Sequence, residues 1–279
     1  MITTAILGAG LLGGSLALAL RNTRRVILYA RRPEAIAQLH QVGLAATSDP
    51  HEAVSNAQEI LFCVPAQATI QLARQLRVTI RPGSFITDVV STKTNIVRVL
   101  QPLFKNHAYF VGSHPMAGSE KSGFSAARAD LFQDANVILT PTRFTPPPAV
   151  AWATEFWKSL HMHVHLLSPR AHDQAVAQIS HLPHLIAATL VASASPQAIL
   201  LAGPGFRDTT RIAASSPDLW TEIFLDNAPS TIKATETFVR NLRQLIQAIR
   251  KKNSKKLLQY LSSAAKKRVP LTAQHPPIK

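Results

Sequence analysis

The sequence predicts an α/β domain built on a parallel sheet, followed by an all-α domain. Three observations support this prediction. A glycine-rich turn joins an apolar strand to a helix near the N-terminus, apolar strand-like runs then alternate with helical ones, and strand-like runs stop at Ser168.

The first element is a short buried strand, Thr3 to Leu7, and an alanine- and leucine-rich helix continues over Leu16 to Leu20. The turn between them has the spacing GxGxxG, which at a strand-to-helix turn is typical of dinucleotide binding. The first glycine permits the tight turn, the second permits close approach of the phosphates, and the third permits close packing of helix on strand. The alternative is an ordinary glycine-rich turn. The predicted cofactor contacts here are Gly8, Gly10, Leu11, Leu12 and Gly13.

The second strand is predicted near Val26 to Arg32, and Ala30 stands near its end, where an NAD site usually places an acidic residue on the ribose 2′-hydroxyl. Arg31 and Arg32 follow, and Glu34 is the only acidic residue between Met1 and Thr47. Because guanidinium groups bind phosphate in a bidentate fashion, we predict NADP as the cofactor, with NAD as the alternative. Two solvated arginines on a basic surface would give the same pattern.

Further strand-like runs extend the predicted sheet. The turn Val64–Pro65 after one of them is predicted to contact the cofactor, and the single cysteine, Cys63, is predicted to lie in the core. These runs are Ile60 to Val64, Phe85 to Asp88, Tyr109 to Ser113 and Asn136 to Thr140.

A proline-rich stretch, Pro141 to Pro148, interrupts this pattern before one more helix and strand. From Ser168 onward the apolar residues follow helical spacing. We therefore predict a dinucleotide-binding domain over residues 1–167 and a helical domain over 168–279, with a disordered tail at Gln274 to Lys279. The predicted later elements are helices near Ala149 to Leu160, Ala171 to Ser193 and Pro217 to Asp226, a strand near His163 to Leu167, and a helix with Ile232, Phe238, Leu242, Leu245 and Ile249 on its apolar face.

Composition predicts a cytoplasmic protein. The chain has 279 residues, of which 46% are hydrophobic and 16% charged, and no run approaches 18 uninterrupted apolar residues. Met1 leads almost directly into the first strand, which leaves no room for a secretory signal. One cysteine excludes an intrachain disulfide and a cysteine-based zinc cluster, and we predict no metal and no membrane contact.

The formal charge is +15, from 30 Lys and Arg against 15 Asp and Glu. The densest basic runs, Arg250 to Lys256 and Lys266 to Arg268, lie far from the glycine-rich turn and lack interleaved aromatic residues. We interpret these basic runs as solvated helix faces. The high charge alone would also fit a non-catalytic protein that senses NADP or binds nucleic acid. Nucleic acid is not the partner we expect.

Six motifs in order resemble the prephenate and arogenate dehydrogenase family, over nearly the whole chain. That resemblance implies NAD(P)-dependent oxidative decarboxylation of prephenate or arogenate by a homodimer that pairs through its helical domain. The motifs are the GxGxxG turn, Asp88 to Lys93, Gly112 to Gly118, His172–Asp173, Ser180 to His184 and Phe206 to Arg211.

The resemblance also implies roles for single residues. His114 would accept or polarise the proton of the ring hydroxyl, and Ser91 would hydrogen-bond to His114 or to that hydroxyl. Arg211 would bind a substrate carboxylate, while His181 is expected to be structural. The further residues implied for the substrate pocket are His184, His172, Trp220 and Glu120, of which Glu120 would pair with the arginine and gate entry.

A second interpretation is a β-hydroxyacid dehydrogenase or imine reductase, which also joins a Rossmann domain to a helical partner. Such an enzyme would need a catalytic lysine on a helix of the second domain. The chain has no lysine from Ser168 to Ile232, which argues against this alternative.

Overall fold

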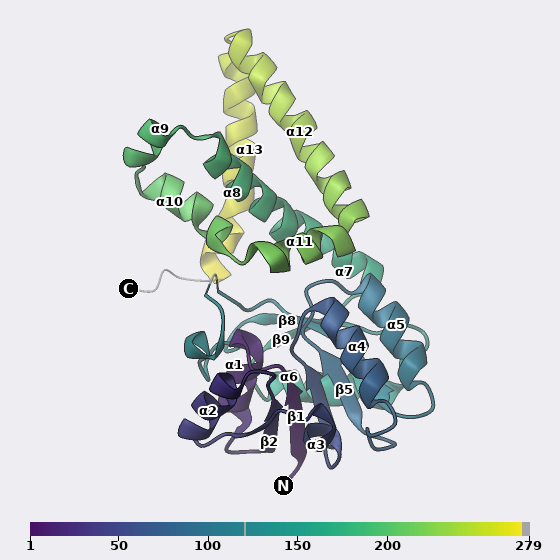
Figure 1. The fold of residues 1–279 in the computed structure, drawn as a ribbon. Helices are drawn as coiled ribbons and strands as arrows, with labels where there is room; N and C mark the ends of the chain where they lie inside the picture. Colours follow the sequence, from purple (N-terminus) through teal and green to yellow (C-terminus); the bar gives the residue numbers. More distant parts are fainter. Residues whose placement is uncertain (120, 275–279) are drawn as a thin grey trace. The chain divides into compact units, whose positions relative to one another are not determined.

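The computed structural model describes residues 1–119 and 121–274, and the chain divides into two compact units, Met1–Thr231 and Ile232–Lys279 (Figure 1). The first unit contains a parallel sheet flanked by helices and then a series of helices, which confirms the predicted α/β class with a helical part after it. Residue 120 and residues 275–279, which include most of the predicted disordered tail, lie outside the described residues.

Six parallel strands form the main sheet in the order β3-β2-β1-β4-β5-β6. The chain starts at β1 in the middle, moves outward to β3, and then returns to the other side of β1 with β4. In sheets of this kind ligands bind beyond the carboxyl ends of the strands, where the order reverses. The strands are β1 (Thr3–Leu7), β2 (Arg25–Tyr29), β3 (Ala45–Thr47), β4 (Glu59–Phe62), β5 (Phe85–Asp88) and β6 (Tyr109–Phe110).

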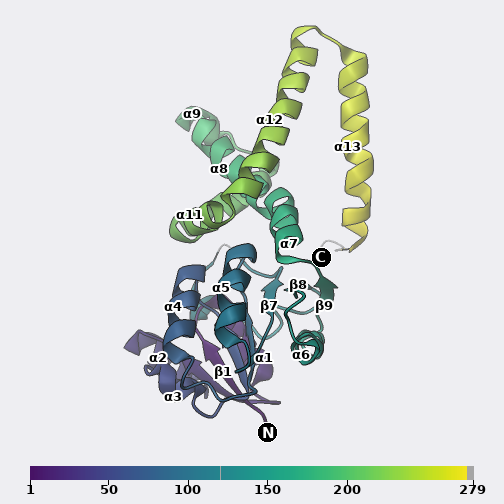
Figure 2. The same cartoon turned by 90° about the vertical axis from the view of Figure 1, so that its right-hand side faces the viewer.

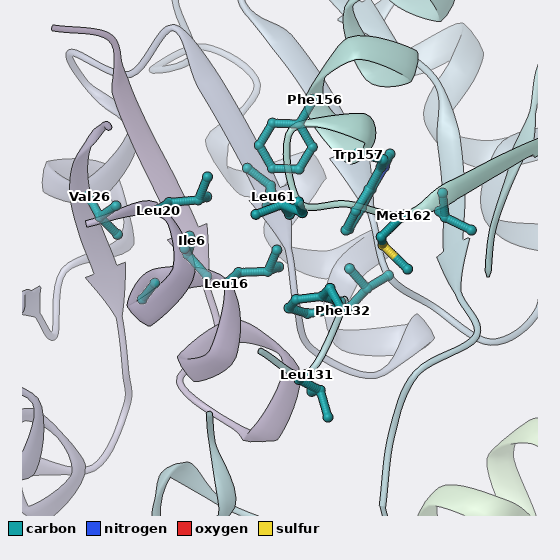
Figure 3. Close-up of a cluster of buried hydrophobic side chains, with 14 of the residues drawn as sticks. Ile6, Leu16, Leu20, Val26, Leu61, Leu131, Phe132, Phe156, Trp157 and Met162 are labelled. Carbon is teal, nitrogen blue, oxygen red and sulfur yellow. The ribbon is translucent and has the colours of Figure 1, made fainter. Parts of the chain in front are cut away.

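Helices cover both faces of this sheet because its strands are apolar on both sides. Ile6 and Leu61 point into one core with Leu16 and Trp157, which Figure 3 shows in close-up. Neighbouring strand residues point into a second core on the opposite face. The first core contains residues of α1 (Leu11–Leu20), α2 (Pro33–Gln41) and α6 (Pro147–Lys158), and the second contains residues of α3 (Pro50–Val54), α4 (Ala66–Leu76) and α5 (Thr94–Phe104).

A second, three-stranded sheet follows, with β7 (Gly112–Pro115) antiparallel to β8 (Asn136–Thr140) and β8 parallel to β9 (His163–Leu166); α6 packs on β8 and β9 (Figure 2). The prediction of one strand over Tyr109 to Ser113 in one parallel sheet is therefore wrong, because the chain passes from β6 to β7 at Val111. Glycine is needed at the crossing: a Cβ on Gly112 would lie 2.7 Å from Thr140 Oγ1 and 2.8 Å from Val97 Cγ2.

The first long helix after the sheets contains a π-helical turn, Ala177–His181, between α7 (Pro169–Val176) and α8 (Leu182–Ser193). A regular α-helix was predicted over Ala171 to Ser193. Pro183 explains the difference, because its ring would clash with the carbonyl of the residue four positions earlier, and that residue lies inside the wider turn. The remaining elements of this unit are a 3-10 turn (Phe124–Ala126), α9 (Pro196–Leu200), α10 (Pro204–Thr210), a 3-10 turn (Arg211–Ala214) and α11 (Pro217–Asp226).

By length and composition alone, one helix in the described part of the chain, Pro169–Ser193, could cross a membrane. Core helices of soluble proteins pass the same test. Here His172, Asp173 and His181 on this helix are buried and hydrogen-bonded to other parts of the protein, which is how a core helix behaves.

The second unit consists of most of α12 (Ala228–Arg250) and of α13 (Ser254–Gln274), joined by a turn in which Lys252 has a left-handed backbone (φ +48°). Large apolar side chains are exposed on both helices, among them Leu242, Ile249 and Leu258. The basic residues at both ends of the turn are exposed as well, as predicted for solvated helix faces.

Candidate active site

A cavity of about 770 Å³ lies beyond the carboxyl ends of β1, β4 and β5. Its wall includes the starts of α1 and α4, the segment after β5, and His114 on β7. The helical part contributes the π-helical turn and α11. The cavity therefore lies where the strand order predicts a ligand site.

The glycine-rich turn fits a dinucleotide. Gly8 has φ +124°, and a Cβ on Gly13 would lie 1.8 Å from the Gly8 carbonyl oxygen, so both glycines are fixed by the protein's own backbone. Gly10 is different: a Cβ there would meet no atom within 4 Å. Its missing side chain leaves open space on the cavity wall, as a pyrophosphate lying against the backbone requires.

The start of α1 also suits an anion. Gly10 is the N-cap and offers no side-chain cap, and the first turn contains no acidic residue, so its N–H groups and helix dipole face the cavity without a competing carboxylate. Leu11 and Leu12 line the cavity next to it, as do Val64 and Pro65 from the turn after β4. The predicted contacts of the two turns are thus brought together.

Arg31 and Arg32 lie at the end of β2 and are exposed. They do not belong to the cavity wall, and Arg32 serves as the N-cap of α2. Within residues 1–119 and 121–274, neither guanidinium forms an ion pair with a carboxylate. Their position after the second strand remains the one expected for a group that binds the ribose 2′ substituent.

His114 begins a line of three hydrogen-bonded side chains. His114 Nδ1 lies 2.8 Å from His172 Nε2, and His172 Nδ1 lies 2.8 Å from Asp173 Oδ1. The Asp173 carboxylate also accepts the backbone N–H groups of Lys93 and Thr94 at the start of α5, each at 2.8 Å. It therefore acts as a cap for α5 and holds α7 against it.

The charge states of this line follow from burial. Burial holds the pKa of His114 well below its usual value near 6.5, with His172 and Lys93 adding to the effect. Burial also lowers the pKa of His172. Burial would raise the pKa of Asp173, but hydrogen bonds from His172, Lys93 and Thr94 outweigh it and leave that pKa lowered. An ionised carboxylate next to two neutral imidazoles results.

These charge states assign the protons. Asp173 can only accept, so His172 carries its proton on Nδ1 and accepts at Nε2. His114 must then donate from Nδ1, which leaves a lone pair on its Nε2. Because His114 lines the cavity, this lone pair is the basic group that the site offers to a ligand.

A buried ion pair lies behind His114. Lys93 and Asp88 are both fully buried, and the Lys93 ammonium donates to the Asp88 carboxylate and, at 2.7 Å, to the carbonyl of Ser113. Asp88 also accepts the N–H of Val90 at 3.0 Å. Burial raises the pKa of Asp88 and lowers that of Lys93, while their attraction opposes both shifts.

Ser91 lines the same cavity, in the segment that follows β5. The predicted bond between Ser91 and His114 is not formed in the described structure, where the partner of His114 is His172, bonded at Nδ1. The second predicted role, a bond from Ser91 to the substrate hydroxyl, stays a prediction.

The predicted substrate residues divide into two groups. Arg211 and Trp220 line the cavity. His184 does not; its ring stacks on Trp220, with centroids 3.7 Å apart, and its buried Nδ1 has no hydrogen-bond partner among the described residues. His172 is fully buried behind His114, so the prediction that it lines the pocket is wrong for the described structure. Glu120 lies outside the described residues.

Two further predictions concern side chains near the site. Cys63 was predicted to lie in the core, but it only packs against the core, is half-buried and borders the cavity. Burial together with Asp88 raises the pKa of its thiol, which makes it a poor nucleophile. His181 is buried, lies 3.3 Å from both Asn227 and Thr231, and meets Trp220 edge-on, which agrees with the structural role expected of it although its residue also borders the cavity. The described residues contain no group of side chains that could hold a metal ion.

Sequence reasoning missed the residues that connect the elements. Asp173, Lys93 and Asp88 lie within the recognised motifs, yet no role was predicted for them. On α11, Asp226 accepts from the Asn95 side chain at 3.0 Å, and Glu222 accepts from the N–H of Gln67, the second residue of α4, at 3.0 Å. Charged residues in otherwise apolar segments were the available signal, because buried charges need partners.

Comparison with known proteins agrees with the motifs. A family model described as the prephenate dehydrogenase nucleotide-binding domain matches residues 16–166, and one described as the prephenate dehydrogenase dimerization domain matches residues 168–263. The cyclohexadienyl dehydrogenase of Zymomonas mobilis is 36% identical over 97% of this chain and 96% of its own length. The prephenate dehydrogenase of Bacillus subtilis is 33% identical over 94% of this chain and 74% of its own length.

Solved structures give the same result. The prephenate dehydrogenase of Aquifex aeolicus, crystallised with hydroxyphenyl propionate and NAD⁺, is 30% identical with a TM-score of 0.89, over 97% of this chain and 98% of that one. The Synechocystis arogenate dehydrogenase is also 30% identical, with a TM-score of 0.82, over 97% of this chain and 100% of that one.

A 3-hydroxyisobutyrate dehydrogenase of Mycobacterium tuberculosis, at 16% identity and a TM-score of 0.60, shares the fold alone. This likeness therefore supports a shared architecture and does not support the activity of a β-hydroxyacid dehydrogenase. Two family models and relatives that cover almost the whole chain show that it belongs to the prephenate and arogenate dehydrogenase family, oxidoreductases that use a nicotinamide dinucleotide.

Proposed function

We propose that this chain catalyses the oxidative decarboxylation of prephenate or arogenate with NADP as the hydride acceptor. The observation that carries the proposal is a neutral, buried His114 whose Nε2 faces a cavity between the glycine-rich turn and Arg211. Such a cavity offers a dinucleotide site, a base and a carboxylate-binding group within one space.

The chemistry requires a base at the ring hydroxyl. Hydride leaves the hydroxyl-bearing carbon while His114 Nε2 accepts the hydroxyl proton. The bond from the ring to its carboxylate then breaks, carbon dioxide leaves, and the bonding electrons make the ring aromatic. The proton on His114 returns to the ring oxygen, so the imidazole is neutral again for the next cycle. A bound nicotinamide ring would take up the hydride.

Substrate anions need cationic partners. Arg211 lies on the cavity wall and can bind a carboxylate through paired hydrogen bonds. Trp220 offers an aromatic face, and His184 fixes that face by stacking on it. Ser91 lies on the same wall and is available to hydrogen-bond the ring hydroxyl.

NADP is preferred over NAD because of the end of β2. Ala30 replaces the acidic residue that would bind a free 2′-hydroxyl, and Arg31 and Arg32 supply positive charge next to it. The Aquifex relative was crystallised with NAD⁺, so cofactor preference has to be measured for this chain.

We further propose a cytoplasmic homodimer. The family model over residues 168–263 is described as a dimerization domain, and α12 and α13 expose apolar side chains that a second copy would cover. The functional division is proposed at 167/168, where the two family models meet.

The test is absorbance at 340 nm with purified protein, using NAD or NADP with arogenate or prephenate. Turnover with at least one pair supports the proposal, and a higher kcat/KM with NADP supports the cofactor preference. No change in absorbance with any of the four combinations, from a folded protein that binds NADP, would overturn the proposed activity. Analytical ultracentrifugation of the same sample tests the dimer, which a monomer at micromolar concentration would contradict.

A further inference from the structure

We propose that Lys93 is a positioning residue for His114. It holds both ends of the hydrogen-bonded line His114–His172–Asp173, through the peptide before His114 and through the Asp173 carboxylate. The inference rests on the proposed function for its kinetic test, but its structural part can be tested without substrate. Lys93 itself does not line the cavity, so it acts through His114 and not on the substrate.

The first contact of Lys93 is made by its side chain. Its ammonium donates to the carbonyl of Ser113 at 2.7 Å, and Ser113 immediately precedes His114 on β7. The second acceptor, the Asp88 carboxylate, lies at the end of β5 and also accepts the N–H of Ser113 at 3.4 Å. The ion pair therefore joins the end of β5 to the strand that carries the base.

The second contact is made by the backbone of the same residue. The N–H of Lys93 donates to Asp173 Oδ1 at 2.8 Å, and the same oxygen accepts from His172. One residue thus fixes the peptide before His114 and the carboxylate at the far end of its hydrogen-bonded line. A displacement of Lys93 would move both.

This arrangement is costly, which argues for a function. Burying an ion pair gives little net stability, because the loss of hydration offsets the attraction. Hydrophobic residues in place of both Lys93 and Asp88 would pack there without that cost. Lys93 has no exposed surface, so solvation of its ammonium contributes nothing. What a hydrophobic residue cannot do is hold the Ser113 carbonyl.

Charge provides a second readout. A cation near His114 opposes protonation of the imidazole, and Lys93 is among the causes of its lowered pKa. Replacing Lys93 with methionine removes this cation and leaves the Asp88 carboxylate unpaired, and both changes favour protonation. The other titratable groups around His114 are His172, Asp173 and His181 on the packed helix and Lys121, Arg211 and Glu222 on the cavity wall.

The test compares Lys93→Met with a matched control, Glu59→Gln. Like Lys93, Glu59 is a buried charged residue in an ion pair: it is bonded to Arg24 at 3.1 Å, to Thr4 at 2.7 Å and to Trp152 at 2.9 Å, but it lies at the start of β4, away from the cavity. Lys93→Met is expected to lower kcat about 10²-fold through misplacement of the base. KM is expected to change less than about two-fold, because no substrate contact is lost. Glu59→Gln is expected to keep wild-type kcat.

The acid limb of kcat/KM is expected to move to higher pH in Lys93→Met and to stay in place in Glu59→Gln. Histidine NMR titration of the proteins without substrate should show the same rise in the pKa of His114. This second readout separates the two proposals, since it is informative even if the wild-type protein turns over none of the four substrate and cofactor pairs. A His114 titration and kcat unchanged from wild type would overturn the positioning role.

Two more variants keep the test decisive if Lys93→Met does not fold. The double variant Lys93→Met with Asp88→Asn removes both charges and is expected to keep the loss in kcat, because the Ser113 carbonyl is still released. Lys93→Arg keeps the charge with a different shape, so it is expected to lower kcat while the acid limb stays at its wild-type pH. Wild-type kcat in whichever of these variants folds would overturn the proposal.

Discussion

The glycine-rich turn and the hydrogen-bonded line from His114 through His172 to Asp173 are two parts of the proposed active site, and they are built in different ways. The turn is local: Gly8, Gly10 and Gly13 lie within six residues, and backbone sterics alone fix two of them. The hydrogen-bonded line joins residues that are distant in sequence: His114 lies on β7, and His172 and Asp173 lie on α7. A buried hydrogen-bond network holds these side chains in place. A cofactor site can therefore follow from a short motif, whereas a catalytic base depends on contacts between distant elements.

The largest expected effect comes from removing the base. His114→Asn should lower kcat by about 10²–10⁴-fold, the range for loss of general base catalysis. NADP affinity should stay at the wild-type level, because the glycine-rich turn is untouched. Absorbance at 340 nm and fluorescence titration of NADP measure the two effects. A variant that keeps more than half of the wild-type kcat would contradict this assignment.

The glycines give the next effect. Gly13→Ala places a Cβ against the Gly8 carbonyl, so we expect a loss of about 1–3 kcal/mol in the free energy of unfolding and loss of NADP binding. Gly10→Ala is the matched control, since its Cβ meets only open space. It should keep the wild-type stability and still bind NADP about 10-fold more weakly. Equal stability losses in both variants, from urea unfolding, would refute the division of roles.

Asp173→Asn tests the far end of the line. The amide cannot accept at both of its positions, so the cap of α5 weakens and the proton on His172 is no longer fixed. We expect a loss of about 1–3 kcal/mol in stability and a fall in kcat with KM nearly unchanged. Urea unfolding and steady-state kinetics are the measurements. A variant with reduced stability but full kcat would show that Asp173 serves the helix alone.

The arginines after β2 should affect one cofactor only. Arg31→Ala and Arg32→Ala should each raise KM for NADP about 10-fold, the cost of a hydrogen bond to a charged group, and leave KM for NAD unchanged. Steady-state kinetics with both cofactors provides the comparison. A parallel rise for NAD and NADP would place these side chains away from the 2′ position.

The pH dependence should be small near neutrality. Because burial lowers the pKa of His114 and His172, both stay neutral in the folded state below pH 6.5, and kcat/KM should persist there. In the unfolded state the same imidazoles bind protons near pH 6.5. Stability should therefore be constant above that pH and fall as the pH drops below it. Thermal melts from pH 8 to pH 5 measure this, and a melting temperature that rises toward pH 5 would contradict the sign.

The same contrast explains what the sequence could predict. Local signals were sufficient for β1, β2, β4 and β5, for the glycine-rich turn and for the change to helices after residue 168, but they missed the short edge strand β3. They failed at Val111, where the chain changes sheets without any break in its apolar run, and at the π-helical turn before Pro183. Both features depend on packing that no short window contains.

Within the site, residue types were recognised by resemblance, while their partners were not. Ser91 was expected to bond to His114 or to the substrate hydroxyl, whereas the residue bonded to His114 is His172, for which a place on the cavity wall was expected. Lys93 and Asp88 lie five residues apart, and both bond to Ser113 on a different strand. The carbonyl of Ser113 accepts from Lys93, and its N–H donates to Asp88. Only the assembled fold reveals such contacts.

The most direct test of the account is the protonation of His114, since the base must present an unprotonated Nε2 to the cavity. Nitrogen-15 NMR of the histidine side chains at pH 7 can report it, with the His114→Asn variant assigning the signal. We predict a neutral His114 with its proton on Nδ1. A proton on Nε2, or a charged imidazolium at that pH, would contradict the central claim.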